Sequence, residues 1–131
     1  MSLAWSEDIP GVGEYVELRR ICGMGPRSAA AAAAGLKGGL HAVTGRERGR
    51  LVAMGRVVGD GGTVAHIVDV CVDPAWQRQG LGTEVMTRLM DWCGANLPDT
   101  CYLSLIADPG SYALYRRHGF EIRTGMGRRL P

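Results

Sequence analysis

The chain has 131 residues, of which 46% are hydrophobic and 21% are charged, and its formal net charge is +2. These values are typical of a globular protein with one hydrophobic core, so we expect residues 1–131 to form a single domain. The small net charge argues against nucleic acid or a membrane surface as a partner, and no apolar run approaches the roughly 20 residues of a membrane span.

The first half of the chain is predicted to contain one helix and several strands. After a lead-in loop over residues 1–13, alternating polar and apolar residues over 14–21 predict an outer strand. Six consecutive alanines within residues 28–36 predict a packing helix, because alanine has the highest intrinsic helix propensity. Short strands are expected at residues 40–44 and 51–58, on either side of a charged turn.

The middle of the chain has clearer boundaries. Asp60, with glycines on both sides, predicts a tight hairpin turn. The return strand at residues 63–72 is apolar on nearly both faces, which places it inside the sheet. An amphipathic helix follows from Leu81 to near Gly94, and residues 101–106 are predicted to form the next strand.

The last helix is expected to open at Asp108 and Pro109, which suit a helix cap and the first helical position. Gly119 is the expected left-handed stop of this helix, and a final strand is predicted at residues 120–123. The order is therefore strand, helix, three strands, helix, strand, helix, strand. This order predicts a mixed α/β fold with a largely antiparallel first half.

The junction between the strand at residues 63–72 and the helix at Leu81 carries the clearest functional signal. Pro74 ends the strand, because proline cannot donate to a ladder. Gln77-Arg78-Gln79-Gly80-Leu81-Gly82 then leads directly into the helix. Unpaired N–H groups at a helix N-terminus, two glycines that allow close approach and the charge of Arg78 together predict a phosphate site.

This junction resembles the Gln/Arg-x-x-Gly-x-Gly/Ala signature of the GNAT superfamily, the acetyl-CoA-dependent N-acetyltransferases. The preceding Val70-Cys71-Val72-Asp73-Pro74 is similar to the fourth strand of that family. A second match lies between Tyr115 and Phe120, which resembles the family's Tyr-x-x-x-Gly-Phe ending. The two motifs cover about residues 63–123, whereas residues 1–60 match in element order only.

The resemblance implies an α/β fold with a mixed, curved, largely antiparallel sheet, helices on both faces and a splay between strands 4 and 5. The co-substrate would be acetyl-CoA, with its pantetheine arm in the splay and no metal ion. The residues expected to contact coenzyme A are Val70, Cys71, Val72, Gln77, Arg78, Gln79, Gly80, Leu81, Gly82, Thr83, Asp108 and Tyr115.

Tyr115 is the candidate general acid, since family members often use this tyrosine to protonate the departing thiolate. A phenol with an ordinary pKa near 10 is protonated at neutral pH and can donate. Candidates for a general base are His66 and Asp69, with Glu14 and Glu17 on the first predicted strand as further options. A structural ion pair is an equal alternative for Asp69, and water-mediated deprotonation needs no dedicated base.

Asp108 departs from the family pattern. Family members frequently have asparagine seven residues before the tyrosine, where it helps to hold the pantetheine or order water. An ionised aspartate accepts hydrogen bonds but cannot donate them. We therefore expect a capping role for Asp108 as an alternative to contact with coenzyme A.

Four cysteines, at positions 22, 71, 93 and 101, lack C-x-x-C spacing. Buried thiols in a reducing, cytoplasmic setting are therefore favoured over disulfides or metal ligands, and no leader segment is visible. The leading functional hypothesis is acetyl transfer to a small-molecule or peptide amine. The alternative is a non-catalytic acyl-CoA-binding sensor or regulatory module, and the family precedent allows a homodimer.

Overall fold

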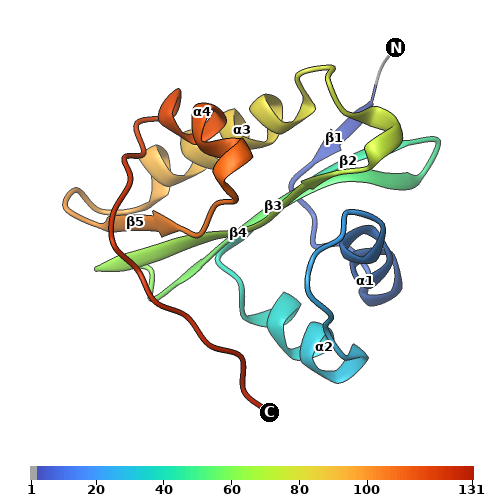
Figure 1. Cartoon of the computed structure of the whole chain (residues 1–131), viewed down its shortest axis with the longest axis horizontal. Coiled ribbons are helices and arrows are strands. Elements are labelled where there is room, and N and C mark those ends of the chain that lie inside the picture. The colour runs from blue at the N-terminus through green and yellow to red at the C-terminus, as the bar shows by residue number, and fades with distance from the viewer. Residues whose placement is uncertain (1–2) are drawn as a thin grey trace.

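In the computed structural model, which describes residues 3–131, one five-stranded sheet lies between two pairs of helices (Figure 1). In chain order the elements are β1 (Ala4–Ser6), α1 (Val12–Ile21), α2 (Ala29–Gly38), β2 (His41–Glu47), β3 (Arg50–Gly59), β4 (Val64–Val72), the 3-10 turn η1 (Pro74–Trp76), α3 (Leu81–Asn96), β5 (Tyr102–Leu105), the 3-10 turn η2 (Pro109–Ser111) and α4 (Tyr112–Arg116). Helices α3 and α4 cover one face of the sheet, and α1 and α2 cover the other.

The strands follow one another across the sheet in the order β1-β2-β3-β4-β5. The first three pairings are antiparallel, and β4 pairs with β5 in parallel. The predicted mixed, largely antiparallel α/β fold with helices on both faces is confirmed. Across residues 3–131 no helix combines the length and the apolar character that crossing a bilayer requires.

The prediction of a strand over residues 14–21 is wrong, because this segment forms α1. The helix begins after Gly11, whose N–H donates to the Glu14 carboxylate at 2.8 Å. Its buried face presents Leu18 and Tyr15, which lie three residues apart, and also the charged side chain of Arg19. Because an arginine occupies one of the buried positions, the apolar residues alone do not show the full helical spacing. The polar and apolar residues alternate instead, as in a strand.

The N-terminal segment also differs from the expected loop, because β1 pairs with the end of β2. The ring of Trp5 lies against Gly45, where a Cβ would approach it to 2.9 Å. Strand β2 accordingly extends through most of the expected charged turn. Only Arg48 and Gly49, with φ of 49° and 82°, form the hairpin loop between β2 and β3.

The predicted strand at residues 120–123 is absent from the part of the chain that the structure describes. After Gly119, which has φ of 89° as expected of a helix stop, residues 120–131 belong to no helix or strand. Arg123 instead donates to the carbonyl of Ile122 and to the carboxylate of Glu121. The segment runs past β5 to the side of α2 (Figure 1).

Gly55 of β3 allows α3 to pack closely on the sheet. A Cβ at this position would lie 2.6 Å from Cγ1 of Val85 and 2.8 Å from Cδ1 of Leu89, both fully buried core residues. Such distances are far below van der Waals contact. Gly55 therefore fixes the spacing between β3 and α3, the helix that follows the predicted phosphate site.

We expect Gly55→Ala to lower the free energy of unfolding by about 1–3 kcal/mol, since α3 must shift to admit the methyl group. Gly94→Ala on the exposed side of α3 is the matched control, because a Cβ there has no neighbour within 4 Å. This control should stabilise the protein by up to about 1 kcal/mol. Urea titrations measure both, and an unchanged midpoint for Gly55→Ala would contradict the packing argument.

Candidate functional site

The junction from β4 to α3 is shaped to bind an anion. Asp73 caps η1 by accepting from the N–H of Ala75 at 2.9 Å. Arg78 and Gly80 then take left-handed conformations, with φ of 65° and 79°, and α3 starts at Leu81. Across the described chain, no acceptor pairs with the N–H groups of residues 78–83. We call these amides and the positive end of α3 the phosphate cradle, because such an arrangement is suited to binding phosphate.

A cleft of about 1140 Å³ begins at this junction and follows β4. It contains nearly all the predicted coenzyme A contacts and both predicted base candidates on β4. Gln79 is the exception, because it does not line the cleft. The predicted residues in the cleft wall are His66, Asp69, Val70, Cys71, Val72, Gln77, Arg78, Gly80, Leu81, Gly82, Thr83, Asp108 and Tyr115.

The cleft exists because β4 and β5 diverge. Their parallel pairing ends at Ile67 and Leu105. From Val68 to Val72 the edge of β4 that faces away from β3 has no partner strand among residues 3–131. The predicted splay between strands 4 and 5 is therefore confirmed, and it leaves main-chain groups free to bind an extended, amide-containing ligand.

A β-bulge lies directly beyond the last β4–β5 pair. Two β4 residues, Asp69 and Val70, stand opposite Gly55 alone, and Asp69 has φ of 59°. A bulge bends its strand and increases the local twist, which turns the following residues away from β5. Aspartate tolerates this left-handed conformation better than most residues do.

The carboxylate of Asp69 is fully engaged on the α1 side of the sheet. It accepts from the hydroxyl of Tyr15 at 2.7 Å and from Nε of Arg56 at 2.9 Å, and it also binds Nη1 of Arg19. All four side chains are buried. Burial and the hydrogen bond to the carboxylate raise the pKa of Tyr15, which stays neutral. This arrangement favours the structural ion pair over a base role for Asp69.

The other base candidates differ in whether they line the cleft. Glu14 binds Arg46, Glu17 binds the exposed Arg20, and neither glutamate lines the cleft. His66 does line it, at the point where the two strands diverge. Its Nδ1 lies 2.9 Å from Oγ of Ser104 on β5. His66 is therefore the predicted base candidate whose position still suits proton transfer in the cleft.

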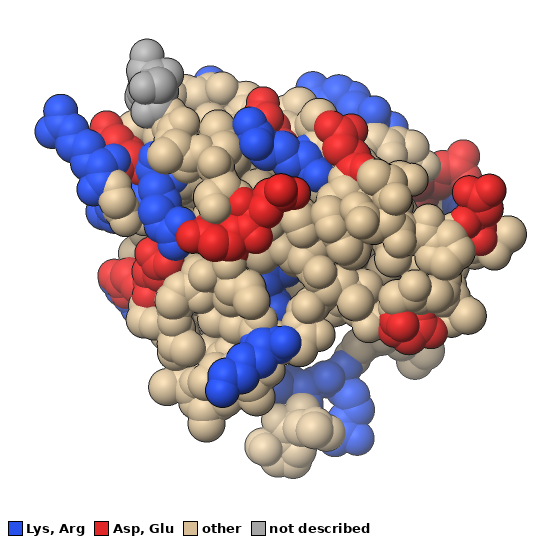
Figure 2. Space-filling view, turned by 180° about the vertical axis from the view of Figure 1, so that it is seen from behind, with Lys and Arg blue, Asp and Glu red and all other residues tan. Residues whose placement is uncertain are grey.

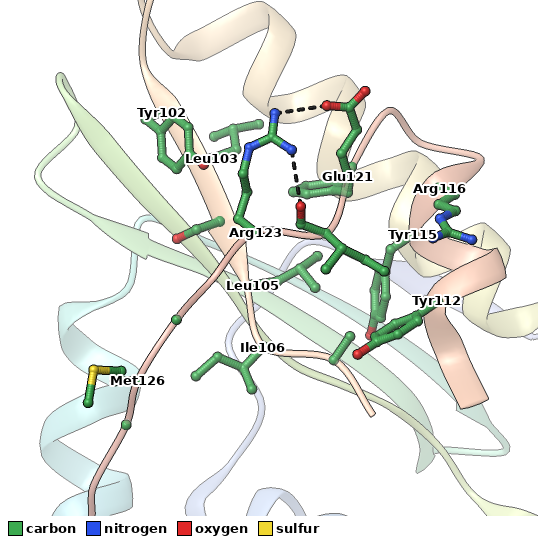
Figure 3. A pocket seen from close by; sticks show the side chains of 16 residues that line it. Tyr102, Leu103, Leu105, Ile106, Tyr112, Tyr115, Arg116, Glu121, Arg123 and Met126 are labelled. Atoms are coloured by element: carbon green, nitrogen blue, oxygen red, sulfur yellow. Dashed lines mark hydrogen bonds and ion pairs between the residues drawn. The ribbon is translucent and has the colours of Figure 1, made fainter. Parts of the chain in front are cut away.

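Tyr115 lies on α4 in the wall between the main cleft and a second cavity of about 370 Å³ (Figure 3). Its ring packs edge-on against Phe120 at 6.4 Å between centroids. Burial, and after it the nearby carboxylate of Asp108, raise the pKa of the Tyr115 phenol above its ordinary value. The hydroxyl therefore carries its proton at neutral pH and can donate it.

Asp108 does not act as the expected cap. Its side chain makes no capping hydrogen bond, and it is the main-chain carbonyl that accepts from the N–H and Oγ of Ser111 at 2.9 and 2.8 Å. The carboxylate lines the cleft and acts on Tyr115 through its charge. Repulsion between a phenolate and this carboxylate adds to the larger effect of burial in favouring the neutral phenol.

The sequence offered no signal for several other wall residues. Leu114 contacts α3 at Gly82, and the following turn of α4 brings Arg117 into the cleft. The loop between α1 and α2 contributes Arg27, and the C-terminal segment contributes Arg129. The same segment closes the second cavity beside β5 (Figure 3). These placements depend on contacts between distant segments, which local patterns do not encode.

Comparison with known proteins defines the class. The sequence profile of the acetyltransferase (GNAT) family matches residues 14–120, and the chain belongs to this family. A probable acetyltransferase of unknown function from methicillin-resistant Staphylococcus aureus is 37% identical, with a TM-score of 0.93 over 98% of this chain and 99% of that one. A GNAT family protein from Streptococcus pneumoniae, 23% identical over 98% of both chains with a TM-score of 0.78, shares the fold.

Two plant proteins show sequence similarity over part of the chain. The chloroplastic GCN5-related N-acetyltransferase 1 of Arabidopsis thaliana is 41% identical over 71 residues, which are 54% of this chain and 35% of that protein. The histone acetyltransferase TAP1 of Glycine max is 37% identical over 81 residues, which are 62% of this chain and 34% of that protein. The chain thus spans about a third of the length of these relatives.

Replacing Asp108 by asparagine should lower the pKa of the Tyr115 phenol, because the negative charge that opposes the phenolate is removed while burial remains. Ultraviolet difference titration measures the shift, with the Tyr115→Phe protein subtracted to isolate this tyrosine. A Tyr115 titration curve identical in the Asp108→Asn and parent proteins would contradict the electrostatic coupling.

Proposed function

We propose that the protein transfers an acetyl group from acetyl-CoA to a primary amine in one direct step, with Tyr115 as general acid. One observation carries the proposal. A phosphate cradle, an unpaired strand edge and a half-buried, protonated tyrosine line the same cleft. They match the three needs of the reaction, which are to bind the diphosphate, to bind the pantetheine arm and to give a proton to the sulfur. Family membership supports acetyl-CoA as the donor.

The chain would bind the donor at two places. The free amides of residues 78–83, with the guanidinium groups of Arg78 and Arg117, suit the diphosphate. The open edge of β4 beyond Val68 suits the amides of the pantetheine arm. Binding at both places would position the thioester near Tyr115 and exclude water from the reacting carbon.

In the proposed reaction the amine nitrogen attacks the acetyl carbon, the carbon–sulfur bond breaks and the Tyr115 phenol gives its proton to the sulfur. A thiol with pKa near 8.5 leaves readily, so a weak acid suffices. The amine loses one proton, and in this proposal His66, which lines the cleft, would accept it directly or through water. No covalent bond to the protein is required.

Tyr115→Phe should lower kcat about 100-fold and leave the affinity for coenzyme A nearly unchanged, because only the proton donor is lost. Thiol release from acetyl-CoA with a panel of amines measures kcat, and calorimetry measures coenzyme A binding. Tyr112→Phe is the control, since Tyr112 lies one turn earlier and lines the second cavity but not the main cleft. Full activity of Tyr115→Phe would remove the assigned acid.

Arg78→Gln should raise the KM for acetyl-CoA about 10-fold, because one charge-assisted contact with the diphosphate is lost. The same variant should use S-acetylpantetheine, which lacks the diphosphate, as well as the parent protein does. Equal losses with both donors would argue against the phosphate cradle. Coenzyme A binding without turnover across broad amine and peptide panels would instead favour the sensor alternative.

A further inference from the structure

The wall of the cleft is positively charged where the loop between α1 and α2 forms part of it. Five arginines line the cleft, namely Arg19, Arg27, Arg78, Arg117 and Arg129, against the two carboxylates Asp69 and Asp108. Arg78 belongs to the β4–α3 junction, and Arg117 follows α4, whose Leu114 lies beside Gly82 of that junction. The other three arginines gather where the loop at residues 22–27 meets the C-terminal segment.

The buried cluster under this wall carries an uncompensated charge. The carboxylate of Asp69 neutralises one of its two arginine partners, Arg19 and Arg56, and Tyr15 is neutral. Arg19 is only 5% exposed and its Nε has no hydrogen-bond partner among the described residues. A buried positive charge without full compensation is costly, and an anion in the adjoining cleft would offset that cost.

Two more guanidinium groups extend this positive region to the surface. Arg27 and Arg129 both donate to the carbonyl of Pro26, at 3.1 and 3.2 Å. Gly25 makes room for this arrangement, because a Cβ there would collide with the guanidinium of Arg129. Helix α2 begins two residues after Arg27, so its positive end lies next to both groups.

This concentration of charge does not follow from the overall composition. The net charge is only +2, and Figure 2 shows acidic and basic side chains interspersed over the upper part of the face in view. Of the two carboxylates that the described residues bring to the cleft wall, Asp69 is bound to arginine and Asp108 is not. The imbalance is therefore local to the cleft.

We propose that the acceptor is a small amine that also carries an anionic group, a carboxylate or a phosphate, held by Arg27 and Arg129 above the buried charge of Arg19. The amine would then point toward the thioester while its acidic group rests against the loop between α1 and α2. The inference rests on the proposed function, since it names the substrate class of the same cleft. A paired guanidinium–anion contact also orients the acceptor.

The test compares amines that differ by the acidic group alone, lysine against cadaverine for a carboxylate and phosphoethanolamine against ethanolamine for a phosphate. At least one acid-bearing member should show a kcat/KM on the order of 100-fold above its partner, as two charge-assisted contacts allow. Arg27→Gln and Arg129→Gln should each raise the KM for that acceptor about 10-fold, with kcat and the KM for acetyl-CoA preserved.

Arg20→Gln is the matched control, because Arg20 is exposed on α1, pairs with Glu17 and lies outside the cleft. It should change neither parameter. Equal use of both members of each pair, or a rise in the KM for acetyl-CoA instead of the acceptor, would overturn the inference.

Calorimetry of the same ligands with the coenzyme A complex separates this inference from the proposed function. Preferential binding of an acid-bearing amine without acetyl transfer would uphold the acceptor class and reject the reaction. Transfer to amines without preference would uphold the reaction and reject the acceptor class. Absence of binding by every member of the panel would also reject the acceptor class.

Discussion

The ion-paired carboxylate of Asp69 is the contact on which the rest of the site depends. It holds a non-glycine residue in a left-handed conformation in the middle of β4, where the bulge begins. Its partners Tyr15 and Arg19 come from α1, and Arg56 comes from β3. The parting of β4 from β5, and with it the cleft, is thereby tied to helices on the opposite face of the sheet.

The hydrogen-bonded cluster around Asp69 also connects the proposed donor site with the proposed acceptor site. Arg19 also donates to the carbonyl of Gly25 at 2.6 Å, and Arg56 donates to that of Gly35 in α2 at 3.1 Å. The bulge that exposes the proposed donor-binding edge of β4 and the loop that borders the proposed acceptor site are therefore connected by one set of hydrogen bonds. A change at either place is expected to reach the other through buried, charge-assisted hydrogen bonds.

The sequence predicted well those features of the fold that are local. The β4–α3 junction, the hairpin at Asp60 and the stop at Gly119 each depend on a few adjacent residues with strong backbone preferences, and all three are confirmed. The mixed sheet and its splay followed from the family resemblance. The prediction failed for α1, because burial of Arg19 depends on Asp69, which is 50 residues away. It also failed for the C-terminal segment, whose Arg129 binds Pro26 across the fold.

The most direct test of the central claim is a crystal structure with coenzyme A bound. The account predicts that the diphosphate accepts from the amides of residues 78–83 and that the sulfur lies within hydrogen-bonding distance of the Tyr115 hydroxyl. A diphosphate held elsewhere, or a sulfur remote from that hydroxyl, would contradict it.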